Sequence, residues 1–129
     1  MHYSDTKFRR HDGKIQTLVD SVLNSRGDSD LKLRRSVELR AATHAGRLPE
    51  GGARLPQELG NYVDKIARHA YLVTDADIEA LCDAGYSEDA IFELTLCAAL
   101  GAGIARLDRG MAAMKGDVDA AKSFPKSCS

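Results

Sequence analysis

His69 is the residue in this chain whose neighbours best suit acid–base chemistry. It follows Tyr62 by seven residues, close to two helical turns, and Asp64 and Arg68 lie nearby in the sequence. Because an ordinary histidine gains or loses its proton near neutral pH, a partly buried His69 beside the Tyr62 hydroxyl could act as a general base. A histidine hydrogen-bonded at the seam between two helices is the commoner arrangement, and we favour that interpretation.

The three cysteines, Cys82, Cys97 and Cys128, form no recognisable redox motif. Two cysteines one helical turn apart, as in Cys-x-x-Cys, can form a catalytic disulfide, and this spacing occurs nowhere in the chain. Cys97 lies among Leu96, Ala98 and other apolar neighbours, so we expect it to be a small buried residue. Neither Cys97 nor Cys82 is predicted to be a nucleophile.

Metal and cofactor sites are not predicted either. A metal site on a helix needs ligands at spacings such as His-x-x-x-His or Glu-x-x-His. Neither spacing occurs among the four histidines, which stand at positions 2, 11, 44 and 69. The stretch 46–54 contains three glycines but lacks the GxxxxGK[ST] pattern of a phosphate-binding loop. We therefore expect no metal and no cofactor.

The composition indicates an all-α protein that binds neither nucleic acid nor membranes. Alanine is plentiful, aromatic residues make up 5% of the chain and prolines number only three, which suits helices packed closely on one another. The net charge of −1 lacks the positive field that non-specific nucleic-acid binding needs. The chain has no run of about 18 apolar residues, and its opening MHYSDTKFRR lacks the apolar segment of a secretion signal. We expect a cytoplasmic protein.

Apolar spacing and capping residues predict about five helices. Asp28 or Ser29 can cap the second helix, Thr74 and Asp77 the fourth, and Ser87 the last. The predicted helices cover about 14–24, 28–45, 56–70, 74–85 and 88–115. The predicted organisation is a flexible N-terminus at 1–12, one helical domain at 13–115 with a Gly/Pro loop at 46–54, and a flexible tail at 116–129.

The last helix is apolar on two sides. Such a helix must be covered on both sides, and a single small chain has little left with which to do so. We therefore expect a homo-oligomer; the alternative is a central helix in a monomeric bundle. Gly101 and Gly103 each cost about 1 kcal/mol relative to alanine in a helix, which is tolerated where another backbone comes close. One stripe is Ile91, Leu94, Thr95, Ala98, Ala102 and Ala105, and the other is Phe92, Leu96, Ala99, Gly103, Leu107 and Met111.

The region from Tyr62 to Gly110 resembles part of the alkylhydroperoxidase/carboxymuconolactone decarboxylase-like superfamily, in particular its peroxidase-related branch. The residues that carry the resemblance are VTDADIEALCDAGYSEDAIFELTLCAALGAGIARLDRG. They comprise a Thr-capped short helix ending in Ala-Gly, an aromatic residue and a Ser-capped long helix. Arg106 and Gly110 match the end of that helix, with Ala105 in place of the family's asparagine.

The resemblance implies an all-α fold that assembles as dimers, trimers or hexamers, with the long helix in the contacts. The peroxidase branch uses Cys-x-x-Cys, which this chain lacks, so thiol peroxidase activity is not expected. The decarboxylase branch uses acid–base residues on a lactone acid. Family proton relays pair glutamate with histidine, so Glu93 could pair with His69 across a helix interface, although an exposed or salt-bridged Glu93 is the simpler interpretation.

We therefore hypothesise a non-redox binding or assembly protein rather than an enzyme, a homo-oligomer with a small-molecule ligand or protein partner at its helix interfaces. The first alternative is an acid–base enzyme acting on a small carboxylated or lactone substrate, with His69, Glu93 and Tyr62 as the candidate catalytic residues. The second alternative is a helical accessory subunit of a larger complex.

Overall fold

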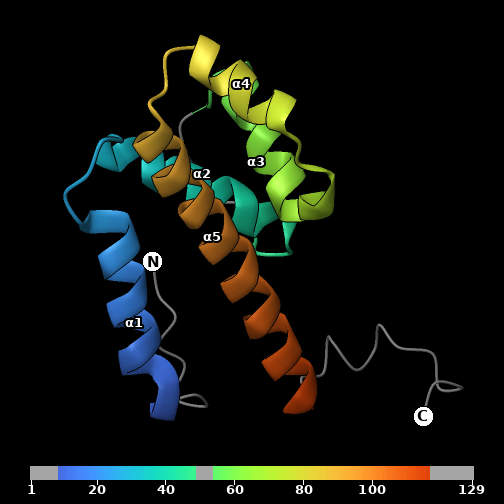
Figure 1. The fold of residues 1–129 in the computed structure, drawn as a ribbon. Coiled ribbons are helices and arrows are strands. Elements are labelled where there is room, and N and C mark those ends of the chain that lie inside the picture. Colours follow the sequence, from blue (N-terminus) through green and yellow to red (C-terminus); the bar gives the residue numbers. More distant parts are fainter. Residues whose placement is uncertain (1–8, 49–53, 117–129) are drawn as a thin grey trace, which may run out of the picture.

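The computed structural model describes residues 9–48 and 54–116, and every regular element among them is helical. The predicted all-α class is thus confirmed for the described part of the chain (Figure 1). In chain order the elements are α1 (Arg9–Asn24), α2 (Leu31–His44), α3 (Gln57–His69), the short 3₁₀ helix η2 (Ala70–Leu72), α4 (Asp75–Asp83) and α5 (Glu88–Met114).

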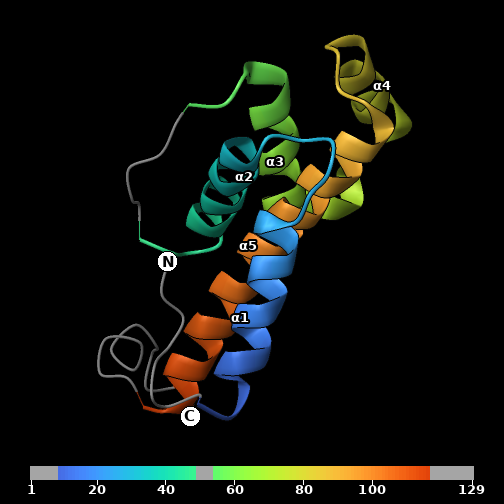
Figure 2. The ribbon, with the colours of Figure 1, turned by 90° about the vertical axis from the view of Figure 1, so that its left-hand side faces the viewer.

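The longest helix, α5, organises the packing of the others (Figure 1). α2 makes the most extensive contact with α5, and α3 packs against both of them. α4 contacts α3 and α5, near the start of α5 (Figure 1). α1 runs antiparallel to α5 and contacts α5 and α2 (Figures 1 and 2). The core therefore lies mainly between α5, α2 and α3.

The first helix begins earlier than its sequence pattern indicated. α1 starts at Arg9, so residues 9–12, which we assigned to a flexible N-terminus, are helical. Of the side chains described for α1, only Val19 and Leu23 are buried. Residues 1–8, residues 49–53 of the predicted loop and residues 117–129 of the predicted tail lie outside the described part of the chain.

Two of the predicted helix starts are confirmed, and one is shifted. The Asp77 carboxylate accepts the backbone N–H of Thr74 at 2.8 Å, at the start of α4, and the Ser87 hydroxyl accepts the N–H of Ala90 at 3.0 Å, at the start of α5. The residue that caps α2 is Asp30, whose carboxylate accepts the N–H of Leu33 at 3.3 Å. Asp28 and Ser29 stand outside α2, where their backbone N–H groups are free to bind another partner.

Gly101 is the point at which α5 comes closest to α2. A Cβ built on Gly101 would lie only 2.2 Å from the backbone oxygen of Glu38. Any side chain at this position would push the two helices apart, so glycine is required by the packing of one chain on itself. The small residues around it let the helix axes approach. They are Ala41 and Ala42 on α2 and Cys97, Ala98, Ala102 and Ala105 on α5, all buried.

α5 is 27 residues long and has the mean hydropathy of a membrane-spanning helix. Length and composition alone do not identify such a helix, because the core helix of a soluble protein has the same properties. Half of the most apolar window of α5 is buried inside the protein. Among the described residues, α5 is therefore long and apolar enough to cross a membrane by length and composition, and the burial of one of its faces gives a second reason for its apolar character.

Candidate functional site

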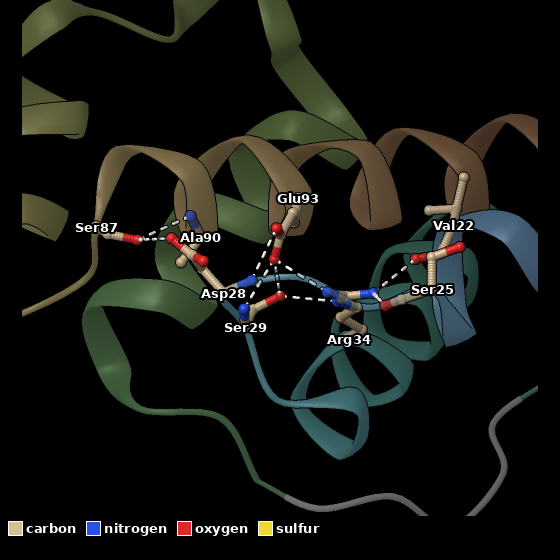
Figure 3. A network of polar contacts seen from close by, with 8 residues as sticks. All are labelled: Val22, Ser25, Asp28, Ser29, Arg34, Ser87, Ala90 and Glu93. Atoms are coloured by element: carbon tan, nitrogen blue, oxygen red, sulfur yellow. Dashed lines mark hydrogen bonds and ion pairs between the residues drawn. The ribbon is translucent and has the colours of Figure 1, made fainter.

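A polar cluster of Asp28, Ser29, Arg34 and Glu93, here called the Glu93 cluster, joins the turn between α1 and α2 to α5 (Figure 3). The Glu93 carboxylate accepts the backbone N–H groups of Asp28 at 2.9 Å and Ser29 at 2.8 Å. It also accepts the Ser29 hydroxyl at 2.7 Å and the Arg34 guanidinium at 3.1 Å. The carboxylate thus holds a turn that is 64 residues away in sequence.

Arg34 is the most deeply buried member of this cluster, with a side chain only 2% exposed. Its guanidinium donates to the Ser29 hydroxyl at 2.8 Å and to the backbone carbonyls of Ser25 and Val22 at the end of α1 (Figure 3). A Cβ built on Gly27 would lie 2.3 Å from both Arg34 Nη2 and Glu93 Oε2. Glycine at position 27 therefore lets the backbone pass directly over the ion pair.

These contacts determine the charge state of Glu93. Partial burial raises the pKa of Glu93, but the hydrogen bonds from the Ser29 hydroxyl and from the backbone of Asp28 and Ser29, together with the charge of Arg34, outweigh it and lower the pKa to about 2. Near neutral pH the group is a carboxylate of very low basicity, surrounded by donors that favour the charged form. Glu93 is suited to fastening α5 to the α1–α2 turn and is a poor candidate for a general base.

Tyr62 lies in a different environment. Its hydroxyl is 2.8 Å from the Thr95 hydroxyl oxygen. Because Thr95 donates its own proton to the carbonyl of Ile91 at 2.7 Å, Tyr62 must be the donor in this pair. Thr95 and Glu93 are two residues apart on α5, and two residues turn an α-helix by about 200°. Tyr62 therefore contacts α5 on roughly the side opposite to the one from which the Glu93 side chain projects.

His69 is exposed, not partly buried as its place on α3 suggested. It is the last residue of α3, and its ring lies edge-on to that of Tyr71, with the ring centroids 5.9 Å apart. All the hydrogen bonds described for Glu93 go to the α1–α2 turn and α2, so the structure does not bring His69 and Glu93 together. The three candidate catalytic residues thus occupy three separate places.

A second polar cluster, which we did not predict, joins α2 to α3. Arg40 donates two hydrogen bonds to the Asp64 carboxylate, at 2.7 and 2.8 Å, and His44 Nε2 lies 2.6 Å from the same carboxylate. The hydrogen bonds from Arg40 lower the pKa of Asp64. The sequence signal was the spacing of Arg40 and His44, one turn apart on α2, but only tertiary contact reveals their shared partner. All three side chains are partly exposed.

The two described cysteines have different surroundings. Cys97 is fully buried in the core, as predicted, and this burial raises the pKa of its thiol to about 12. Cys82 is exposed, and neither of these two cysteines is in a disulfide. Cys128 lies outside the described residues. Within residues 9–48 and 54–116, no three His, Cys, Asp or Glu side chains are grouped closely enough to hold a metal ion.

The two apolar stripes of α5 differ in burial. Every residue of the first stripe is buried except the half-buried Thr95, and this face packs into the core. The second stripe faces solvent, with Phe92 63%, Leu96 41% and Leu107 45% exposed. Met111, which we assigned to this stripe, is only half-exposed. Gly110 and Met114 continue the line of the stripe better, and Met114 is 81% exposed. We call the set Phe92, Leu96, Ala99, Gly103, Leu107, Gly110 and Met114 the exposed stripe.

Helical geometry places the exposed stripe opposite the core. At about 100° per residue its seven members fall within an arc of roughly 80°, centred on Gly103. Leu94, which is buried, lies about 180° from that centre. A Cβ built on Gly103 or Gly110 would meet nothing within 4 Å. Within residues 9–48 and 54–116, the stripe is therefore an uncovered apolar surface with room above its glycines.

No family model, curated protein or solved structure matches this chain.

Proposed function

We propose that this protein is a non-redox assembly or binding protein whose copies associate through the exposed stripe of α5. The observation that carries the proposal is the row of large apolar side chains along one helix face, opposite the face that packs in the core. Contiguous apolar surface is uncommon on monomers and is typical of interaction sites. Covering it contributes about 25 cal/mol for each Å² of apolar surface removed from water. These exposed side chains are Phe92, Leu96, Leu107 and Met114.

The state of the cysteines supports a non-redox role. The chain has no Cys-x-x-Cys pair, and its most central cysteine, Cys97, is buried with the pKa of its thiol raised to about 12. A thiol in that state is overwhelmingly protonated near neutral pH, and the thiolate is the reactive form. Neither peroxide reduction nor disulfide exchange is favoured by these surroundings.

The separation of the three candidate catalytic residues favours assembly over acid–base catalysis. Tyr62 donates its proton within the core, His69 is exposed at the end of α3, and Glu93 is held as a carboxylate by four donors. A general base must be within hydrogen-bond reach of the proton that it removes. The described contacts give the three groups different partners and different burial, and this arrangement supports assembly over the acid–base alternative.

Light scattering on the eluting peak of a size-exclusion column tests the proposal. The wild-type protein should elute with the mass of two or more chains. Leu107→Glu should shift the protein towards the monomer, because a charge in the middle of a dehydrated apolar contact is strongly unfavourable. Tyr71→Glu is the matched control: it alters another exposed apolar residue, 82% exposed on η2, and should leave the mass unchanged.

Circular dichroism must show that both variants keep the helix content of the wild type, since Leu107 and Tyr71 are exposed in the single chain. A wild-type protein that remains monomeric across the whole accessible concentration range would overturn the proposal. Such a monomer, if it were recovered from cells in a complex with another protein through α5, would support the accessory-subunit alternative instead.

A further inference from the structure

The exposed stripe has a symmetry in its spacing. Relative to Gly103, its members stand at −11, −7, −4, 0, +4, +7 and +11 residues. The same set is obtained when the helix is reversed about Gly103. A two-fold axis through this glycine would therefore lay the stripe of one copy along the stripe of another, with the helices antiparallel. Self-complementary contacts of this kind are what two-fold homodimers require.

The sizes of the side chains fit the antiparallel arrangement. Reversal about Gly103 places Leu96 against Gly110 of the second copy and Ala99 against Leu107 of the second copy. In the central part of the contact large side chains then face small ones, and Gly103 faces its own copy at the crossing point. Protein interfaces pack at the density of protein interiors, which requires large residues to alternate with small ones across a contact. Phe92 would face the unbranched, adaptable Met114.

A parallel arrangement in the same register would lack this fit. Leu96 would face Leu96 and Leu107 would face Leu107, so the bulky residues would hold the helices apart. The glycines would then face one another across gaps, and gaps lose the dispersion contacts that stabilise packing. The order of sizes along the stripe thus favours one of the two directions.

The glycines of α5 divide by their surroundings in the same way. Gly101 is explained by its contact with the Glu38 backbone, but none of the described residues lies near a Cβ added at Gly103 or Gly110. Each glycine in a helix interior lowers helix stability relative to alanine. A second backbone or a large side chain above the glycine accounts for that loss, and the antiparallel copy supplies both.

From these observations we infer that two copies of this chain pack α5 against α5 in antiparallel orientation, with Gly103 at the two-fold axis and Leu96 seated over Gly110 of the second copy. This inference rests on the proposed association through the exposed stripe and adds its partner, direction and register.

Disulfide cross-linking tests the register separately from the association. The background carries Cys82→Ser and Cys128→Ser, and the buried Cys97 is kept. Ala99→Cys protein mixed with Leu107→Cys protein should form a covalent dimer on mild oxidation. Ala99→Cys alone should not, because residues 99 of the two copies would be about 12 Å apart along the helix axis, and bridged cysteines need Cα atoms within about 7 Å.

The control for random collisions is Tyr71→Cys in the same background, an exposed position away from α5. The mixed pair should cross-link about tenfold faster than this control or faster still, since association raises the effective thiol concentration to the millimolar range. Rapid self-cross-linking of Ala99→Cys would establish a parallel contact and overturn the inference.

The failures of the two proposals are distinguishable. If light scattering gives an oligomer that Leu107→Glu dissociates, but the mixed pair does not cross-link above the collision control, the association stands and the antiparallel register is wrong. If light scattering gives only a monomer, both are wrong. The Gly103→Leu variant adds a second measurement: it should lower the oligomer mass without lowering helix content.

Discussion

The backbone oxygen of Glu38 lies directly over Gly101, so closely that a Cβ on that glycine would be 2.2 Å away. This contact fixes the distance between α2 and α5, the two helices with the most extensive contact in the described structure. Two residues further along α5, Gly103 faces open space. Gly101 and Gly103 look alike in the sequence, but only Gly101 is required by the packing of α2 on α5. Substitutions at the two positions should therefore have opposite effects on the unfolding free energy.

Gly101→Ala should lower the free energy of unfolding by about 1–3 kcal/mol, the usual effect of overpacking a well-packed contact. Chemical denaturation followed by circular dichroism measures it. Gly103→Ala is the matched control and should be neutral or stabilising by up to about 1 kcal/mol, because alanine favours the helix. Both are best measured in the Leu107→Glu background, which removes the contribution of association. Equal effects at the two positions would contradict the assignment of Gly101 to the α2–α5 contact.

Glu93→Gln should destabilise the fold by about 2–3 kcal/mol. The amide keeps some acceptor capacity, but the buried Arg34 loses its charged partner, and an uncompensated buried charge is costly. Thermal or urea unfolding measures the change. Glu88→Gln, an exposed position in the first turn of the same helix, should lower the unfolding free energy by less than about 1 kcal/mol. If Glu93→Gln lowers the unfolding free energy no more than Glu88→Gln does, the role of the Glu93 cluster is contradicted.

Acid should weaken the fold through Glu93. Its pKa falls from 4.5 to about 2 in the folded protein, so the carboxylate contributes stability that is fully present above pH 4.5 and is lost as the pH falls towards 2. The unfolding free energy of the wild type should therefore decline over that window. Glu93→Gln should decline less steeply, with the remaining slope due to groups such as Asp64 and Asp77, whose pKa values are also lowered. Parallel curves for the two proteins would show that Glu93 does not titrate in this window.

The cysteines should differ sharply in reactivity. In a Cys128→Ser background, an alkylating reagent should modify the exposed Cys82 in the native protein and reach the buried Cys97 only on unfolding. Mass spectrometry of the labelled peptides measures both rates. The same chain should consume peroxide no faster than a variant without cysteines. Thiol-dependent peroxide turnover that disappears in Cys97→Ala would contradict the non-redox proposal.

Local signals in the sequence were sufficient for most of the helices. Thr74 with Asp77 and Ser87 were identified as caps because a helix start is satisfied by residues three positions away, a relationship that the sequence itself displays. The cap of α2 was misassigned to Asp28 or Ser29. Asp28, Ser29 and Asp30 are three consecutive residues that can each cap a helix. The choice among them depends on Glu93, whose carboxylate accepts the backbone N–H groups of Asp28 and Ser29.

The candidate site was predicted less well, because it depends on contacts between distant segments. Glu93 is a candidate catalytic residue because of its residue type. Its charged partner is Arg34, which is 59 residues away in sequence, and not His69. The Arg40–Asp64–His44 cluster was not expected at all. The sequence gives the chemical type of each of these side chains. It does not give their partners, because the packing of the helices determines which helix faces each side chain.

The sequence by itself determined that this chain is helical, where α4 and α5 begin, that Cys97 is a core residue and that α5 is apolar on two sides. These properties follow from periodicity and capping, which act within a few residues along one helix. Only the tertiary structure decided which side of α5 is buried, which glycine is needed by the chain itself and where the charge of Glu93 is compensated. Each of these depends on surfaces brought together from remote parts of the chain, and the core selects among them by packing and by hydrogen-bond satisfaction.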